Sequence, residues 1–117
     1  MRTIIALALI FAASGALGDE LADAHKLALQ GRDSYWNCLA REYSSEGTKG
    51  MSAQAFTTDI QSVCPSERQN FRVALIDFLS LQNPNAESGD YLSTANRAIE
   101  LAQKDIVTAF AKHKAAN

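Results

Sequence analysis

Hydrophobic residues recur at three- and four-residue spacing along most of this chain, which is the spacing of one face of an α-helix. The most regular stripe lies in the last third and consists of Leu92, Ala95, Ile99, Ala102, Ile106, Ala109 and Phe110. Similar stripes occur in residues 19–43, 52–63 and 65–82. The pattern therefore predicts four helical segments, of which the second is short and the last ends at about Lys114.

The first of these helices is predicted from about Asp19 to Tyr43, with one apolar face. That face consists of Leu21, Ala24, Ala28, Tyr35, Cys38 and Leu39. The tripeptide 31–33 (Gly-Arg-Asp) interrupts the stripe, and glycine lowers helix propensity, so we expect a bend or a short break there. The polar residues 44–50 are predicted to form a loop and to be the least structured part of the folded domain.

Local signals set the other helix boundaries. Ser52 is a suitable N-cap for the short helix, whose stripe includes Val63. The dipeptide 64–65 (Cys-Pro) should end that helix and start the next, because a residue before proline is pushed out of the helical region and proline favours the first helical position. Residues 83–85 (Asn-Pro-Asn) should stop the third helix, and Ser88 or Asp90 should cap the fourth.

The amino-terminal residues resemble a secretory signal peptide. Arg2 provides a positive charge, residues 4–13 are apolar, and the small residues of 13–18 precede two acidic residues. We expect cleavage after Gly18, or as a second choice after Ala16. The apolar run is shorter than the roughly 20 residues that span a membrane, so no integral membrane segment is expected after cleavage.

The two cysteines, Cys38 and Cys64, are predicted to form a disulfide. Exported chains meet oxidising conditions, and two cysteines allow one intramolecular pairing. An intermolecular bridge and a reactive thiol remain the alternatives. Together with the scarcity of glycine and proline, these features predict a small all-α, up-down helical bundle of three long helices and one short helix, a single domain over residues 19–117 stapled by one disulfide. The expected location is periplasmic or secreted.

Charge and motifs exclude several classes of function. The net charge of the whole chain is −2, and removal of residues 1–18 takes away only Arg2 among the charged residues, which makes it −3. Such a chain lacks the basic footprint of a nucleic-acid-binding protein. No catalytic constellation, cofactor motif or metal-ligand spacing is evident, so we expect neither enzymatic activity nor a cofactor.

A few residues are candidates for binding. Tyr35, Trp36 and Tyr43 could line a partner or ligand surface, or could be core aromatics packed on the disulfide. Other candidates have simpler readings as solvated surface groups: His25 and His113, which an even number of up-down helices would bring to one pole and which could bind a metal with Asp23 or sense pH, and the possible anion ligands Arg68, Arg72 and Arg97. A protein partner is therefore possible but unidentified, and the oligomeric state is open.

Two segments, 34–38 (Ser-Tyr-Trp-Asn-Cys) and 64–71 (Cys-Pro-Ser-Glu-Arg-Gln-Asn-Phe), distantly resemble the HdeA group of periplasmic acid-stress chaperones. That group consists of small exported all-helical proteins with one disulfide, an aromatic residue before the first cysteine and a charged helix after the second. The whole chain also resembles the small exported helical proteins common in Gram-negative bacteria. These resemblances imply a periplasmic, non-enzymatic interaction or stress-protective protein; the alternative is a periplasmic carrier of a small molecule or metal.

Overall fold

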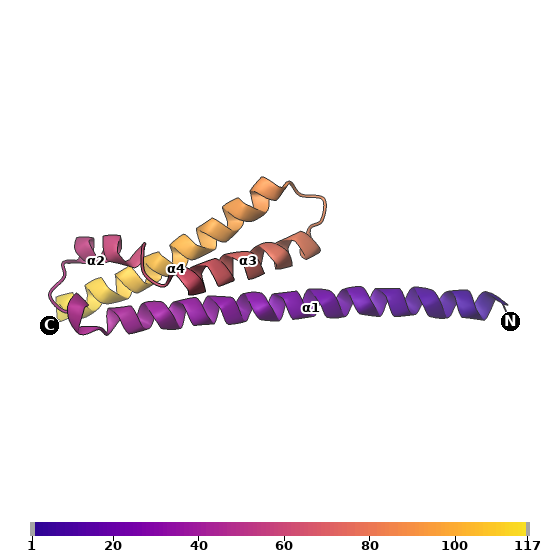
Figure 1. Ribbon diagram of the computed structural model, residues 1–117, viewed down its shortest axis with the longest axis horizontal. Helices are drawn as coiled ribbons and strands as arrows, with labels where there is room; N and C mark the ends of the chain where they lie inside the picture. The colour runs from indigo at the N-terminus through magenta and orange to yellow at the C-terminus, as the bar shows by residue number, and fades with distance from the viewer. Residues whose placement is uncertain (1, 117) are drawn as a thin grey trace.

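A computed structural model describes the backbone of residues 2–116 and the side chains of residues 18–45 and 47–116. Over that backbone the chain forms α-helices and one short 3-10 turn, without a strand. In order these are α1 (Arg2–Tyr43), η1 (Glu46–Thr48), α2 (Ala53–Ile60), α3 (Pro65–Gln82) and α4 (Ser88–Ala116), arranged as Figure 1 shows. The predicted all-α bundle with three long helices and one short helix is confirmed.

The long helix α1 begins at Arg2 rather than near Asp19, and it is unbroken across residues 31–33. The predicted bend or break at that tripeptide is wrong. Gly31 instead lies where α1 and α3 pack closely, because a Cβ atom placed on it would lie 3.0 Å from the Cα atom of Phe71. The side chains of the predicted signal segment up to residue 17 lie outside the described residues, so its cleavage stays a prediction.

The chain passes along the bundle three times, not four. Phe56 of α2 stacks on Phe110 near the end of α4, with ring centroids 4.0 Å apart. Arg72 of α3 instead donates a hydrogen bond to the side chain of Asn96, in the first third of α4. Helices α2 and α3 therefore both run antiparallel to α4 (Figure 1). Together they make one pass along the bundle, which is interrupted at residues 61–64, and we call it the α2–α3 pass. Helices α1 and α4 run parallel, since Tyr35 pairs with Gln103 and Tyr43, further along α1, with Phe110.

Pro65 contributes to the interruption between α2 and α3. In an unbroken helix the carbonyl of Gln61 would accept the N–H of residue 65, which proline lacks. The Arg68 guanidinium donates to that carbonyl instead. Cys64, just before the proline, has φ 57° and ψ 47°, the left-handed region, and the predicted start of the third helix at Pro65 is confirmed. The predicted extension of the short helix to Cys64 is wrong, because α2 ends at Ile60 and Val63 lies outside it.

Two other local predictions are confirmed, at the start of α2 and at the end of α3. The Ser52 hydroxyl accepts a hydrogen bond from the N–H of Ala55 at 3.0 Å, and α3 ends at Gln82, before Asn83.

The connection 44–50 is more ordered than expected. Thr48 is buried there, and its hydroxyl lies 2.9–3.1 Å from three carbonyl oxygens at the end of α1 and in the following turn, so it ties this turn to the helix.

The core surrounds the predicted disulfide, which is confirmed. Cys38 on α1 and Cys64 before α3 are bonded, with Cα atoms 6.1 Å apart. The fully buried large side chains near it are Tyr35, Leu39, Phe56 and Ile60. Of the predicted α4 stripe, four residues are buried, namely Ala95, Ile99, Ile106 and Phe110. Ala109 is exposed, and Leu92 is 46% exposed in the first turns of α4, where the Tyr91 hydroxyl donates to the carbonyl of Asn83 just after α3.

Candidate functional site

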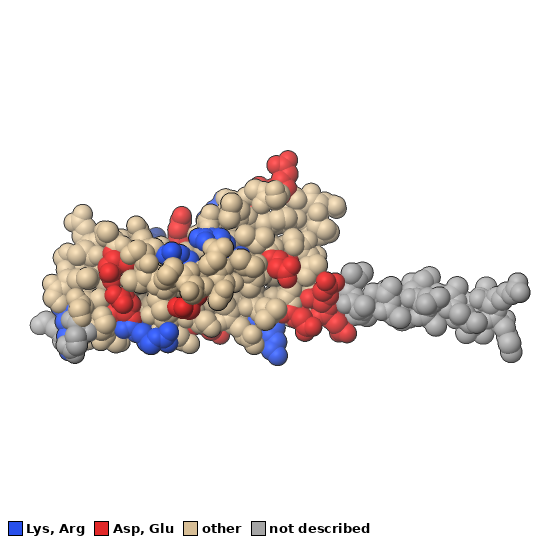
Figure 2. Space-filling model, in the orientation of Figure 1, with Lys and Arg blue, Asp and Glu red and all other residues tan. Residues whose placement is uncertain are grey.

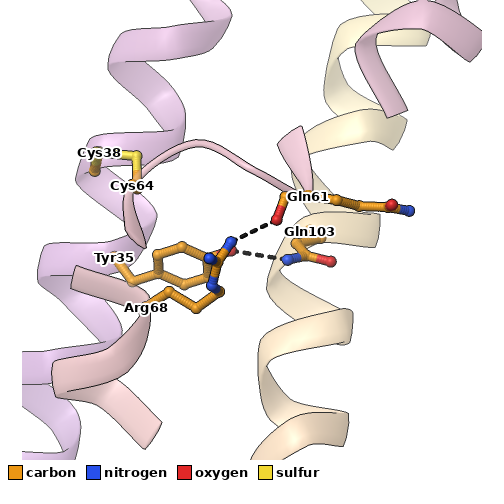
Figure 3. Close-up of a disulfide and its surroundings, with 6 residues drawn as sticks. All are labelled: Tyr35, Cys38, Gln61, Cys64, Arg68 and Gln103. Carbon is orange, nitrogen blue, oxygen red and sulfur yellow. Dashed lines mark hydrogen bonds between the residues drawn. A yellow bond between two sulfur atoms is a disulfide. The ribbon is translucent and has the colours of Figure 1, made fainter. Parts of the chain in front are cut away.

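Tyr35 and Trp36, adjacent on α1, differ in burial. Tyr35 is completely buried, and its hydroxyl accepts a hydrogen bond from the Gln103 side-chain amide at 3.0 Å (Figure 3). It shares the apolar face of α1 with Ala28, two turns before it, and Leu39, one turn after it, which is why it points inward. Tyr35 is therefore a core residue in this structure, in line with the interpretation of these aromatics as core residues.

Trp36 forms one wall of a surface groove between α1 and α4. The side chain is 36% exposed, and across the groove Leu101 of α4 is 59% exposed. The groove has a volume of about 390 Å³, and small or buried apolar residues form its floor: Phe71, Ala98 and Ala102. We call this feature the Trp36 groove.

Charged side chains flank the apolar floor of the Trp36 groove. Arg32 and Asp33 form an exposed ion pair of 3.2 Å on α1, and Asp105 lies on the α4 side. Arg32–Asp33 is the sole ion pair among the described side chains, so the Asp105 carboxylate has no cationic partner there. The rim consequently has a net negative charge that a bound group could complement.

The sequence analysis did not identify the α4 side of the groove. A signal was present, because Leu101 is a large apolar residue outside the inward stripe of that helix, between Ile99 and Ala102. A leucine at such a position points away from the core, and only the packing of α4 beside α1 shows that Trp36 is its neighbour.

Tyr43 belongs to a different hollow, at the end of the bundle where α1 and α4 terminate. Its ring makes edge contacts with Phe56 and Phe110, at centroid distances of 6.5 and 5.9 Å. The hollow has a volume of about 470 Å³ and is also lined by Lys49, His113 and Lys114. Tyr43 lies seven residues, or about 10 Å of helix, from Trp36, and the two side chains line separate hollows.

His25 and His113 do not approach one another. The His25 ring packs on Phe78, with centroids 4.8 Å apart, whereas His113 lies 5.9 Å from the Tyr43 ring. Eighteen residues of α1, about 27 Å, separate His25 from Tyr43. The expected shared pole is wrong because α2 and α3 together make a single pass, which places the start of α1 and the end of α4 at opposite ends.

One group of potential metal ligands occurs among the described side chains, namely Cys38, Cys64 and Glu67, whose ligand atoms lie within 4.8 Å of one another. The two sulfur atoms are bonded to each other. Since a thiolate is the form of cysteine that binds a metal, the oxidised protein presents only one ligand here.

Two carboxyl groups meet between α1 and α2. A hydrogen bond with Asp59 raises the pKa of Glu42 above 4.5, and partial burial and the negative charge of Asp59 act in the same direction. One oxygen of Asp59 is buried and receives no hydrogen bond from the described donors. Protonation of Glu42 therefore favours the contact between these helices.

Known proteins provide no guide to this arrangement. No family model matches the sequence, and neither curated proteins nor solved structures give a significant match.

Within the described part of the chain, no helix combines the length and the hydropathy needed to cross a membrane. On the face drawn in Figure 2, acidic and basic side chains are interspersed over the bundle.

Proposed function

We propose that this protein is a non-enzymatic interaction module of an extracytoplasmic compartment, and that it binds a segment of another protein in the Trp36 groove. The observation on which the proposal rests is the pairing of exposed Trp36 and Leu101 across an apolar floor. Aromatic anchors in hydrophobic depressions dominate protein–protein binding energies. The preferred partner would insert a large apolar side chain and place a basic residue near Asp105.

The disulfide and the amino-terminal sequence support the proposed compartment. A Cys38–Cys64 bridge persists under oxidising conditions and is rare in the cytosol. Residues 1–18 have the layout of a secretory signal. The resemblance to acid-stress chaperones adds a specific form of the proposal, in which the groove holds exposed apolar segments of unfolding clients.

Site-specific photo-crosslinking would test the groove in the native compartment. A photoreactive phenylalanine analogue at Leu101 should yield adducts with another protein, whereas the same analogue at Leu92, an exposed leucine of the same helix outside the groove, should not. Equal adducts at the two positions, or none at Leu101, would contradict the proposal.

A second measurement uses the intrinsic fluorophore. Trp36 is the only tryptophan, so its emission reports directly on occupation of the groove. With a reduced, unfolded model client, the emission should shift to shorter wavelength and client aggregation should decrease. Leu101→Ala should weaken both effects, and Leu92→Ala should leave both unchanged.

The alternative function is small-molecule transport, for which the Tyr43 hollow is the specific observation. Two aromatic rings, Tyr43 and Phe110, and the basic side chains around them suit an aromatic anion. Mass spectrometry of the native protein from the exported fraction would decide this. A retained small molecule that is lost in Tyr43→Ala would favour the carrier, and a bare protein would disfavour it.

A further inference from the structure

A polar hollow of about 410 Å³ lies between α3 and α4, apart from the Trp36 groove. Its walls are formed by Gln61, Arg68 and Arg72 from the α2–α3 pass and by Asn96, Glu100 and Gln103 from α4. We call it the arginine hollow. Arg68 and Arg72 are four residues apart on α3, so their side chains lie on the same face of the helix.

Both guanidinium groups are held by neutral acceptors. Arg68 donates to the backbone carbonyl of Gln61, as Figure 3 shows, and Arg72 donates to the side-chain oxygens of Gln69 and, at 3.0 Å, Asn96. No carboxylate of the described residues lies within 4.0 Å of either group, since the one ion pair there is Arg32–Asp33. Two half-buried positive charges thus share a hollow in which no described carboxylate is in ion-pair contact with them.

This arrangement suits recognition of an anion. A guanidinium has five N–H donors in a fixed plane, and these hydrogen bonds engage only some of them, so donors remain for a ligand. The neutral contacts also orient both side chains in advance, which lowers the entropy cost of binding. Carboxylate and phosphate groups match this fork of donors, and charge-assisted bonds to them are roughly twice as strong as neutral ones.

We propose that the arginine hollow binds a small free oxyanion, a carboxylate or phosphate, between Arg68 and Arg72. Glu100 opposes this binding, because its carboxylate lines the same hollow and repels an anion. Arg97 does not line the hollow although it lies next to Arg72's partner Asn96, so it is a matched control for general electrostatic effects.

The site is independent of the Trp36 groove. At 100° per residue, Asn96, Glu100 and Gln103 lie on one flank of the buried α4 stripe, and the groove residues Ala98, Leu101 and Asp105 lie on the other. A ligand in the hollow would leave Trp36 free for a partner.

The test is a titration of the disulfide-intact protein with sodium phosphate and, in a second arm, sodium acetate, at constant ionic strength, monitored by the Nε–H signals of arginine in nitrogen-15 NMR spectra. The signals of Arg68 and Arg72 should shift and saturate, while that of Arg97 should not move. The arm that saturates at lower concentration identifies the class of oxyanion.

Three variants complete the test. Arg72→Gln should weaken binding about tenfold or more, and Arg97→Gln should leave the affinity unchanged. Glu100→Gln should tighten binding severalfold, and it places no demand on the fold because Glu100 is exposed. Shifts that rise linearly without saturation in both arms, equal shifts at all arginines, or an unchanged or weaker affinity in Glu100→Gln would overturn the proposal.

Discussion

Removal of the disulfide should cost this domain a large share of its stability. Cys38 and Cys64 are 26 positions apart, and on the chain-entropy model a bridge closing a loop of that length stabilises the folded state by about 3.5 kcal/mol. Domains of this kind are typically stable by only about 5–15 kcal/mol. The double variant Cys38→Ser with Cys64→Ser is the appropriate change, because a single substitution leaves a free thiol that can form an intermolecular bridge.

The assay is urea unfolding monitored by circular dichroism, for the oxidised protein and for the double variant. The free energy of unfolding should decrease by about 2–5 kcal/mol. A companion variant, Cys38→Ser with Cys64→Gly, lacks the same bridge but should be more stable than the serine variant by about 1 kcal/mol, because residue 64 is left-handed and glycine adopts that conformation without steric cost.

A loss below about 1 kcal/mol would refute the estimate from loop closure, since it would mean that the unfolded chain is already restrained without the bridge. If the glycine variant were the less stable of the two, residue 64 would leave the left-handed region once the bridge is absent, and the conformation would be a consequence of the disulfide.

Three further changes test other parts of the bundle. Gly31→Ala should lower the free energy of unfolding by about 1–3 kcal/mol because its Cβ atom would meet the α3 backbone at 3.0 Å, whereas Gly89→Ala, with nothing within 4 Å, should be neutral or slightly stabilising. Tyr35→Phe should cost about 0.5–1.5 kcal/mol, measured by urea unfolding, because it removes the hydrogen bond from α4. Glu42→Gln should flatten the pH dependence of the melting temperature above pH 4.5.

The sign of the last effect follows from the raised pKa of Glu42. The folded protein keeps that proton to a higher pH than the unfolded chain, so the associated stability is fully present below pH 4.5 and is lost as the pH rises through the raised pKa. A wild-type melting temperature that falls on acidification through this window, to the same extent in Glu42→Gln, would contradict the assignment. Equal stabilities of the two alanine variants would likewise exclude a close contact at Gly31.

Sequence reasoning succeeded where the cause is local. Pro65, the hydroxyl of Ser52 and the turn residues 83–85 act within a few positions of the chain, and the starts of α2 and α3 and the end of α3 were predictable from them. The burial of Tyr35 was also predictable, because it shares a helical face with Ala28 and Leu39. Pairing of the two cysteines needed only their number and the expected compartment.

The failures concern properties that depend on how helices pack. The tripeptide beginning with Gly31 looked like a helix breaker, but the backbone of α3 approaches at that glycine and the packing stabilises an unbroken helix. The two histidines were placed at one pole because four helices were counted as four passes. Nothing in the sequence states that α2 and α3 run in the same direction, since that depends on Phe56 and Arg72 meeting the same helix.

The helix break and the candidate anion site have a common origin. Because Pro65 has no N–H, the Gln61 carbonyl needs another donor, and Arg68 supplies it. That hydrogen bond fixes Arg68 in the wall of the hollow. Substitution of Arg68 would therefore disturb both the junction between α2 and α3 and any bound anion. Loss of binding in an Arg68 variant would therefore be ambiguous, whereas tighter binding in Glu100→Gln has an electrostatic cause alone. The sign of the Glu100 effect on affinity consequently distinguishes an anion-binding site from an arginine whose only role is to donate to the Gln61 carbonyl between α2 and α3.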